Sequence, residues 1–192
     1  ESLEFENAKN IYFAEKYDAA VRALSTYLSE NPNSANAPEA RYYLADSYAK
    51  AGDAPAALRT YDELLRSNSP YTARAASRAA DVARKQGDAA RALPYYRVAV
   101  RRASTKNEEV GAQVALAETY LLANQPDSAA ITARLVLPGA GVVPGAAGRA
   151  QLVLGKAALA KGDVATAQTE LQRTADTHKD AAGAEALYLL GQ

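Results

Sequence analysis

Apolar residues recur along this chain at intervals of three and four positions, the spacing that places side chains on one face of a helix. In one such segment, Ala20, Leu24 and Tyr27 fall on a common face between polar neighbours. β-Branched residues are sparse, and no segment convincingly reads as a strand. The pattern predicts helices at about 2–14, 17–30, 38–51, 54–67, 72–86, 89–103, 108–123, 127–137, 147–161 and 164–177, with another beginning near 181.

A Gly-Asp step separates several of these helices and recurs at regular distances. It stands in KAGDAPAAL (50–58), KQGDAARAL (85–93) and AKGDVATAQ (160–168). Glycine suits the left-handed conformation that ends a helix, and aspartate suits the N-cap of the next one. Two further copies lack the glycine, AEKYDAAVRAL (14–24) and ANQPDSAA (123–130). The predicted unit is therefore a helical hairpin repeated about every 35 to 38 residues.

Residues at fixed places in these hairpins resemble the tetratricopeptide repeat (TPR) family. The second hairpin has the expected residues on both of its helices, namely Leu44, Ala45, Tyr48, Ala57, Tyr61 and Leu64. The resemblance implies an all-α fold, a right-handed superhelical α-solenoid of about five hairpins plus the first helix of a sixth. We expect one solenoid domain over 1–192, with repeats at approximately 1–37, 38–72, 73–109, 110–147, 148–183 and a partial 184–192.

Two segments depart from the regular pattern. LPGAGVVPGAAG (137–148) holds two prolines and four glycines, which predicts a long loop between repeats or, alternatively, a mobile contact loop. GAEALYLLGQ (183–192) reaches only the start of a sixth repeat. Because a solenoid usually ends in a polar capping helix, we expect the chain to be a fragment of a longer protein.

Composition argues against catalytic chemistry. The chain has no Cys, and its single histidine, His178, lies among polar residues at a predicted helix end, where a solvated surface role is expected. Acidic residues are scattered, and no phosphate-binding glycine motif is present. We therefore expect a noncatalytic protein with no cofactor, no metal site and no small-molecule substrate. No apolar run approaches the roughly 20 residues that span a bilayer, so direct membrane insertion of this part is not expected.

The resemblance to TPR proteins also implies where function resides, because the first helices of successive hairpins line a concave groove that holds a peptide or protein segment. Aromatic residues between single charges suit such a ligand, although each ring could equally pack against a neighbouring hairpin. Charge reversal at Asp46 or Asp81 is expected to weaken partner capture without lowering the melting temperature. Transferred by position, the candidate groove residues are Phe5, Lys9, Tyr12, Tyr42, Asp46, Lys50, Ser77, Arg78, Asp81, Lys85, Val114, Glu118, Leu121, Leu152, Lys156 and Tyr188.

Charge is balanced over the whole chain, with 22 basic and 22 acidic residues, but it is unevenly distributed. Residues 71–106 hold nine Lys/Arg against two Asp, whereas residues 1–40 hold seven acids against three bases. The basic third repeat could dock an acidic surface or acidic polymer, or meet the acidic front of a second copy in self-association. Nucleic acid is a poorer candidate, since no aromatic-basic RNA motif is present. Arg74 and Arg78 match only the last part of the carboxylate clamp of chaperone-binding TPR proteins, so that clamp is not expected.

The segment NPNSANAPEARYYLADSYAKAGDAPAAL (31–58) is similar to TPR proteins of the bacterial cell envelope, of the type of the Tol-Pal-associated periplasmic coordinator and the outer-membrane assembly lipoprotein. This resemblance implies a scaffold of an envelope or periplasmic complex, with the cytoplasm as the alternative location. A second interpretation is a regulatory or targeting array that belongs to a larger enzyme or membrane protein.

Overall fold

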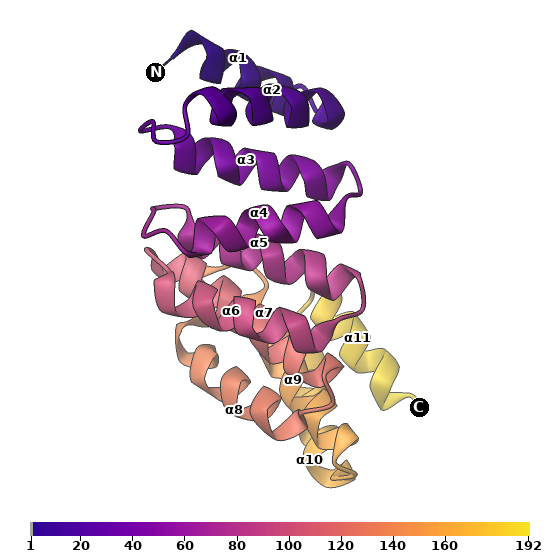
Figure 1. Ribbon diagram of the computed structural model, residues 1–192. Coiled ribbons are helices and arrows are strands. Elements are labelled where there is room, and N and C mark those ends of the chain that lie inside the picture. Colours follow the sequence, from indigo (N-terminus) through magenta and orange to yellow (C-terminus); the bar gives the residue numbers. More distant parts are fainter. Residues whose placement is uncertain (1) are drawn as a thin grey trace. The chain divides into compact units, whose positions relative to one another are not determined.

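The computed structural model describes residues 2–192. All regular secondary structure within that range is helical. The predicted all-helical architecture is confirmed, and the predicted helix limits lie within two residues of the observed ones. The helices are α1 (Leu3–Phe13), α2 (Tyr17–Glu30), α3 (Ala37–Lys50), α4 (Ala54–Leu65), α5 (Thr72–Lys85), α6 (Ala89–Arg102), α7 (Lys106–Leu122), α8 (Pro126–Val136), the 3-10 helix η1 (Leu137–Val142), α9 (Ala146–Ala160), α10 (Val164–Thr177) and α11 (Ala181–Leu190) (Figure 1).

The chain divides into two compact units, unit 1 up to Gly87 and unit 2 from Asp88 onward. In unit 1 each helix from α1 to α5 packs on the next one along the chain, and α3 also contacts both α1 and α5. In unit 2 the helices α6 to α11 follow the same rule, and α9 also contacts both α7 and α11. Odd-numbered helices, the first of each hairpin, are therefore neighbours within each unit and form a face of their own.

The turn inside each hairpin has one backbone conformation. Gly52, Gly87 and Gly162 have φ angles of 91°, 78° and 74°, as the Gly-Asp step predicts. Glu15 and Asn124 occupy the same place in the two hairpins that lack the glycine, with φ angles of 58° and 56°. Because side chains other than glycine are strained in this left-handed region, the turn geometry is set by the hairpin and not by the residue at that position.

Aspartates after the three glycines cap the next helices. The carboxylates of Asp53, Asp88 and Asp163 accept hydrogen bonds from backbone N–H groups three residues ahead, at 3.0, 2.9 and 3.1 Å. Each bond satisfies one of the N–H groups that the first turn of a helix leaves without a partner. Lys16 and Gln125 stand at the same position before α2 and α8 and make no such side-chain bond.

Residues 137–148 differ from the predicted loop. The 3-10 helix η1 begins where α8 ends, packs against α7, α8 and α9, and buries Ala140 completely. Gly145, with φ of 76°, then leads directly into α9. The sequence pattern of helices missed η1 because a 3-10 helix has three residues per turn and accommodates the glycines and Pro138 in a short run.

Alanine and glycine bring helices close together in the core. In unit 1, Ala8, Ala20 and Ala40 are buried beside Leu24 and Tyr27. In unit 2, a Cβ placed on Gly155 would lie only 2.6 Å from Cδ2 of Leu171, so α9 and α10 meet at a distance that glycine alone permits. Larger residues fill the space that these small ones leave, and packing of this kind fixes the positions of the first helices.

Candidate functional site

An open groove of about 1010 Å³ lies in unit 1 at the C-terminal ends of α3 and α5. The starts of α2 and α4 close one side of it, because each second helix begins directly after the turn that ends the first. The groove is lined by Tyr17, Asp46, Ala49, Lys50, Gly52, Ala54, Tyr61, Arg78, Asp81, Val82, Arg84, Lys85 and Gln86.

Asp46 is a buried carboxylate at the base of this groove, with only 4% of its surface exposed. The hydroxyl of Tyr12 donates a hydrogen bond to Oδ2 of Asp46 at 2.7 Å, and that of Tyr61 donates to Oδ1 at 3.3 Å. Burial, together with the neighbouring Asp46, raises the pKa of both tyrosines well above the usual value. Both hydroxyls therefore stay neutral and remain donors, so the carboxylate links α1, α3 and α4.

Arg78 extends this network into solvent. Its Nε atom lies 3.8 Å from Oδ1 of Asp46, and its side chain is 52% exposed. A hydrogen bond with Tyr42 and the charge of Asp46 raise the pKa of Arg78 further above its already high value. The guanidinium is thus always charged and is held by two groups of α3, while its planar fork has five N–H donors in total.

Aromatic rings form a connected cluster beside the network. Tyr12 contacts Tyr17 and Tyr43 with ring centroids 6.0 and 4.7 Å apart, and Tyr42 contacts Tyr71 at 5.7 Å. Burial and the nearby Glu39 raise the pKa of Tyr71 to about 12. The rings are partly exposed, so the cluster offers rigid contact surface across α1, α3 and the start of α5.

Three of the candidate groove residues belong to the core instead. Phe5 and Val114 are fully buried and Leu152 is 6% exposed. Phe5 packs on the ring of Tyr27 at 5.3 Å, and Leu152 joins the cluster that includes Leu171. Phe5 and Leu152 turn toward the second helix of their hairpins, and Val114 has no exposed surface, so the expectation that these three side chains face a ligand is wrong.

Asp46 is buried as well, but it lines the groove of unit 1. The other candidates stay accessible to different degrees. Lys50, Arg78, Lys85 and Tyr188 are exposed, and the remaining side chains are half-buried, namely Lys9, Tyr12, Tyr42, Ser77, Asp81, Glu118, Leu121 and Lys156. The groove in unit 1 brings together Asp46, Lys50, Arg78, Asp81 and Lys85.

Two charged candidates of unit 2, Glu118 and Lys156, form ion pairs with residues of the adjacent first helix. Arg149 of α9 binds Glu118 of α7 through two hydrogen bonds of 2.6 and 2.7 Å. Lys156 of α9 forms an ion pair with Glu185 of α11. Because these charged side chains are paired within the protein, fewer of them are available to bind a ligand in unit 2 than in unit 1.

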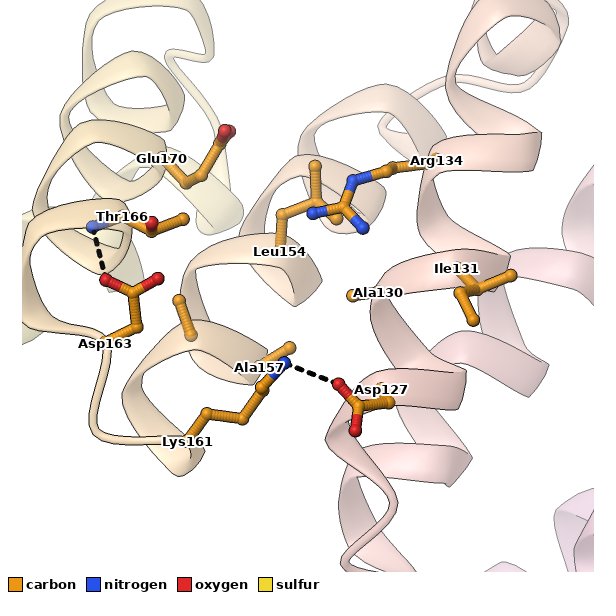
Figure 2. Close-up of a pocket in the computed structure, with 11 residues that line it drawn as sticks. Asp127, Ala130, Ile131, Arg134, Leu154, Ala157, Lys161, Asp163, Thr166 and Glu170 are labelled. Atoms are coloured by element: carbon orange, nitrogen blue, oxygen red, sulfur yellow. Dashed lines mark hydrogen bonds and ion pairs between the residues drawn. The ribbon is translucent and has the colours of Figure 1, made fainter.

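Sequence reasoning missed a pocket of about 330 Å³ in unit 2, between α8, α9 and α10 (Figure 2). Its floor includes Leu154, Ala157 and Ala158, and Lys161 closes one end through an ion pair with Asp127 at 2.5 Å. Arg134 points toward this floor from α8. No motif marks the pocket in the sequence, since its residues come from three helices and serve other purposes in the repeat.

Among the groove residues that the candidate list lacks are Tyr17, Tyr61, Arg84 and Gln86. The two tyrosines lie on second helices, where the repeat pattern indicates core packing, and Tyr61 does pack there while its hydroxyl reaches the groove. Among residues 2–192, no three His, Cys, Asp or Glu side chains gather in a way that could hold a metal ion. In the same range, none of the helices combines the length and apolar character that crossing a membrane requires.

Comparison with protein families supports the repeat assignment. The sequence model of the tetratricopeptide repeat matches residues 6–72, 44–108, 77–141 and 152–192. Among curated proteins, no sequence matches this chain. These findings carry no support for the narrower resemblance to envelope proteins.

Solved structures share the fold at low sequence identity. MamA from Desulfovibrio magneticus RS-1 is 20% identical, with a TM-score of 0.72 over 91% of this chain and 92% of that one. A kinesin light chain with TPR-like repeats from Podosopora anserina is 17% identical, with a TM-score of 0.69 over 92% and 96%. A tetratricopeptide repeat protein from Parabacteroides merdae is 14% identical, with a TM-score of 0.76 over 98% and 72%.

Proposed function

The chain belongs to the tetratricopeptide repeat family, and we propose that it is a noncatalytic scaffold that holds an extended segment of a partner protein in the groove of unit 1. Proteins of this family bind other proteins or peptides. The observation that carries the proposal is the groove itself, which combines about 1010 Å³ of open space with exposed charges and a buried polar base.

The groove of unit 1 suits an extended segment better than the corresponding face of unit 2. Tyr17 and the exposed cations Lys50, Arg78 and Lys85 line one continuous surface. Aromatic rings and arginine are the residues that most often dominate the energy of protein interfaces. In unit 2, by contrast, Arg149 and Lys156 are engaged with Glu118 and Glu185.

The polar groups of the groove favour binding over catalysis. The hydroxyls of Tyr12 and Tyr61 both donate to Asp46, and their raised pKa values make them weak acids and poor nucleophiles at neutral pH. Asp46 is occupied by these donors and by Arg78, so it is poorly placed to act as a general base. This arrangement supports a scaffold that positions a partner without transforming it.

We further propose a bacterial envelope complex as the setting, on the strength of the segment 31–58 alone. Fractionation of the cells that make the protein tests this setting directly. Recovery with the periplasmic or membrane fraction is expected, and recovery with the cytoplasmic fraction alone would contradict it.

Site-specific photo-cross-linking tests the groove as the binding site. A photoreactive amino acid replaces Gln86, an exposed and uncharged groove residue, in the full-length protein in its native cells. The matched control places it at Arg59, an exposed residue of the second helix α4. Adducts of defined mass are expected from position 86 and not from position 59. Equal labelling at both positions, or labelling at 59 alone, would refute the groove as the site.

A further inference from the structure

We propose that the segment held in the groove of unit 1 is acidic, and that Lys50, Arg78 and Lys85 bind its carboxylates. This inference rests on the proposed function and names the chemistry of the partner. It concerns side chains at the C-terminal ends of α3 and α5, where the three cations line the same open space.

Basic residues outnumber acidic ones in the lining, and both acids already have partners. The lining contains four basic residues, Lys50, Arg78, Arg84 and Lys85, and two acidic residues, Asp46 and Asp81. Asp46 accepts hydrogen bonds from two tyrosines, and Asp81 lies 4.0 Å from Arg84. The groove lining therefore keeps a net positive charge that can act on a ligand, although the whole chain is neutral. A local positive groove in a neutral protein selects the part of a partner that carries carboxylates.

Arg78 is arranged to bind a carboxylate with little loss of freedom. Asp46 and Tyr42 hold its guanidinium from the side of α3. Half of the side chain remains exposed to the groove, and a planar guanidinium matches the geometry of a carboxylate. Because the fork is held in place before binding, less conformational entropy is lost when the ligand arrives.

Lys50 and Lys85 supply two further ammonium groups without internal ion pairs. Within residues 2–192 no carboxylate lies in salt-bridge distance of either Nζ atom. Lys50 lies 5.4 Å from the ring centre of Tyr17, so an aromatic face supports the stem and charge at the edge of the groove. The two residues end α3 and α5, and they extend the positive surface beyond Arg78.

On the first-helix face of unit 2, charged side chains form ion pairs within the protein. There Arg149 and Lys156 each pair with a glutamate on the adjacent first helix, Glu118 and Glu185 respectively. No acidic residue takes that place opposite Lys50 or Lys85 in the described part of unit 1. The partner is inferred to supply the missing carboxylates.

Fluorescence anisotropy with defined peptides tests the proposal on the full chain. The probe is a fluorescein-labelled twelve-residue peptide of alternating Glu and Ala, and the control probe has Gln in place of every Glu. Binding of the Glu peptide is expected at low salt, with an affinity that falls as salt rises toward physiological strength, while the Gln peptide binds at least about tenfold more weakly. Equal binding of the two peptides, or no binding of either, overturns the proposal.

Variants at the lysines locate the binding without disturbing the Asp46 network. The double variant Lys50→Gln/Lys85→Gln removes two charges that have no internal ion pair, and it is expected to weaken binding of the Glu peptide about tenfold. Arg59→Gln removes one exposed charge from α4 and is expected to leave the affinity unchanged. Equal losses in both variants would place the interaction outside the groove and overturn the assignment.

A single-stranded oligonucleotide of twelve nucleotides serves as the competing class of anion. If it binds more tightly than the Glu peptide and depends equally on Lys50 and Lys85, the inferred partner chemistry is wrong. The proposed function fails separately, because the cross-linking at position 86 does not depend on peptide charge. Cross-linking there without binding of the Glu peptide would retain the scaffold and reject the acidic partner.

Discussion

At the scale of single residues, Asp46 has a different role from the one that its sequence position suggests. The repeat places it on the groove side of a first helix, which led us to expect that charge reversal would spare the melting temperature. Its burial and its contacts with Tyr12, Tyr61 and Arg78 instead predict that charge reversal at Asp46 lowers the melting temperature. For Asp81, which is half-buried, the original expectation stays a prediction.

Asp46→Ala is predicted to destabilise unit 1 by about 3 kcal/mol, because the buried hydroxyl of Tyr61 and the partner atoms of Tyr12 and Arg78 lose their acceptor. Urea denaturation of the full chain measures the change. Glu63→Ala, an exposed residue of α4, is the control and should shift the midpoint little. An equal midpoint for both variants would show that the network does not contribute to stability.

Glu15 and Asn124 are strained residues at the turn position that glycine occupies in the other three hairpins. Glu15→Gly is predicted to stabilise the protein by about 0.5 kcal/mol, since relief of the left-handed backbone outweighs the greater freedom of glycine in the unfolded chain. Asn124→Gly should give a smaller gain, because asparagine tolerates this region better. Gly52→Ala should instead cost about 1 kcal/mol. Thermal melting followed by circular dichroism ranks the three, and a loss of stability in Glu15→Gly would contradict the account.

At the scale of elements, the N-cap of α10 makes that helix sensitive to pH. Hydrogen bonds from the side chain and backbone of Thr166 lower the pKa of Asp163, the cap of α10. A carboxyl whose pKa is lower in the folded state stabilises the fold above its unfolded pKa, and it loses this contribution as the pH falls through the folded value.

The cap of α10 is therefore predicted to weaken on acidification. Asp163→Asn keeps a capping side chain that does not titrate in this range. Urea midpoints of the wild type and this variant should differ most near neutral pH and converge in acid. A difference that is constant from neutral pH to acid would show that the ionised carboxylate adds nothing to the cap.

The helices and turns could be predicted from the sequence because their signals are local. Gly52 and Asp53 act on the residues next to them, and apolar spacing recurs within single helices. The Asp46 network could not be predicted in this way, since it needs α1, α3, α4 and α5 to be brought together at defined rotations. The burial of Val114 was missed for the same reason: a first helix has a groove side and a core side, and the boundary depends on its neighbours.

At the scale of the whole molecule, stability should be distributed along the chain, because helices contact only near neighbours in sequence. A local change in unit 2 is then expected to leave the amide protection of unit 1 intact. Gly155 and Gly111 make a matched pair for this test, as both lie inside helices of unit 2. A Cβ on Gly155 would overlap Leu171, whereas one on Gly111 would meet open space.

Gly155→Ala is predicted to lower hydrogen-exchange protection in α9 and α10 and to destabilise unit 2 by about 2 kcal/mol through overpacking. Gly111→Ala should stabilise α7 by about 0.5–1 kcal/mol, since alanine favours the helix more than glycine does. Hydrogen exchange read by mass spectrometry distinguishes the two. Loss of protection in α1 to α5 by Gly155→Ala would mean that the chain behaves as one cooperative block.

The aromatic cluster beside the groove has an optical consequence. The chain has no tryptophan, and eight of its 12 tyrosines (positions 12, 17, 27, 42, 43, 48, 61 and 71), with both phenylalanines, lie in unit 1. Near-ultraviolet circular dichroism reports the fixed packing of such rings, whereas the far-ultraviolet signal reports helices everywhere. The near-ultraviolet signal of the intact protein is therefore weighted toward unit 1, and ligand binding in the groove can be followed without an added dye.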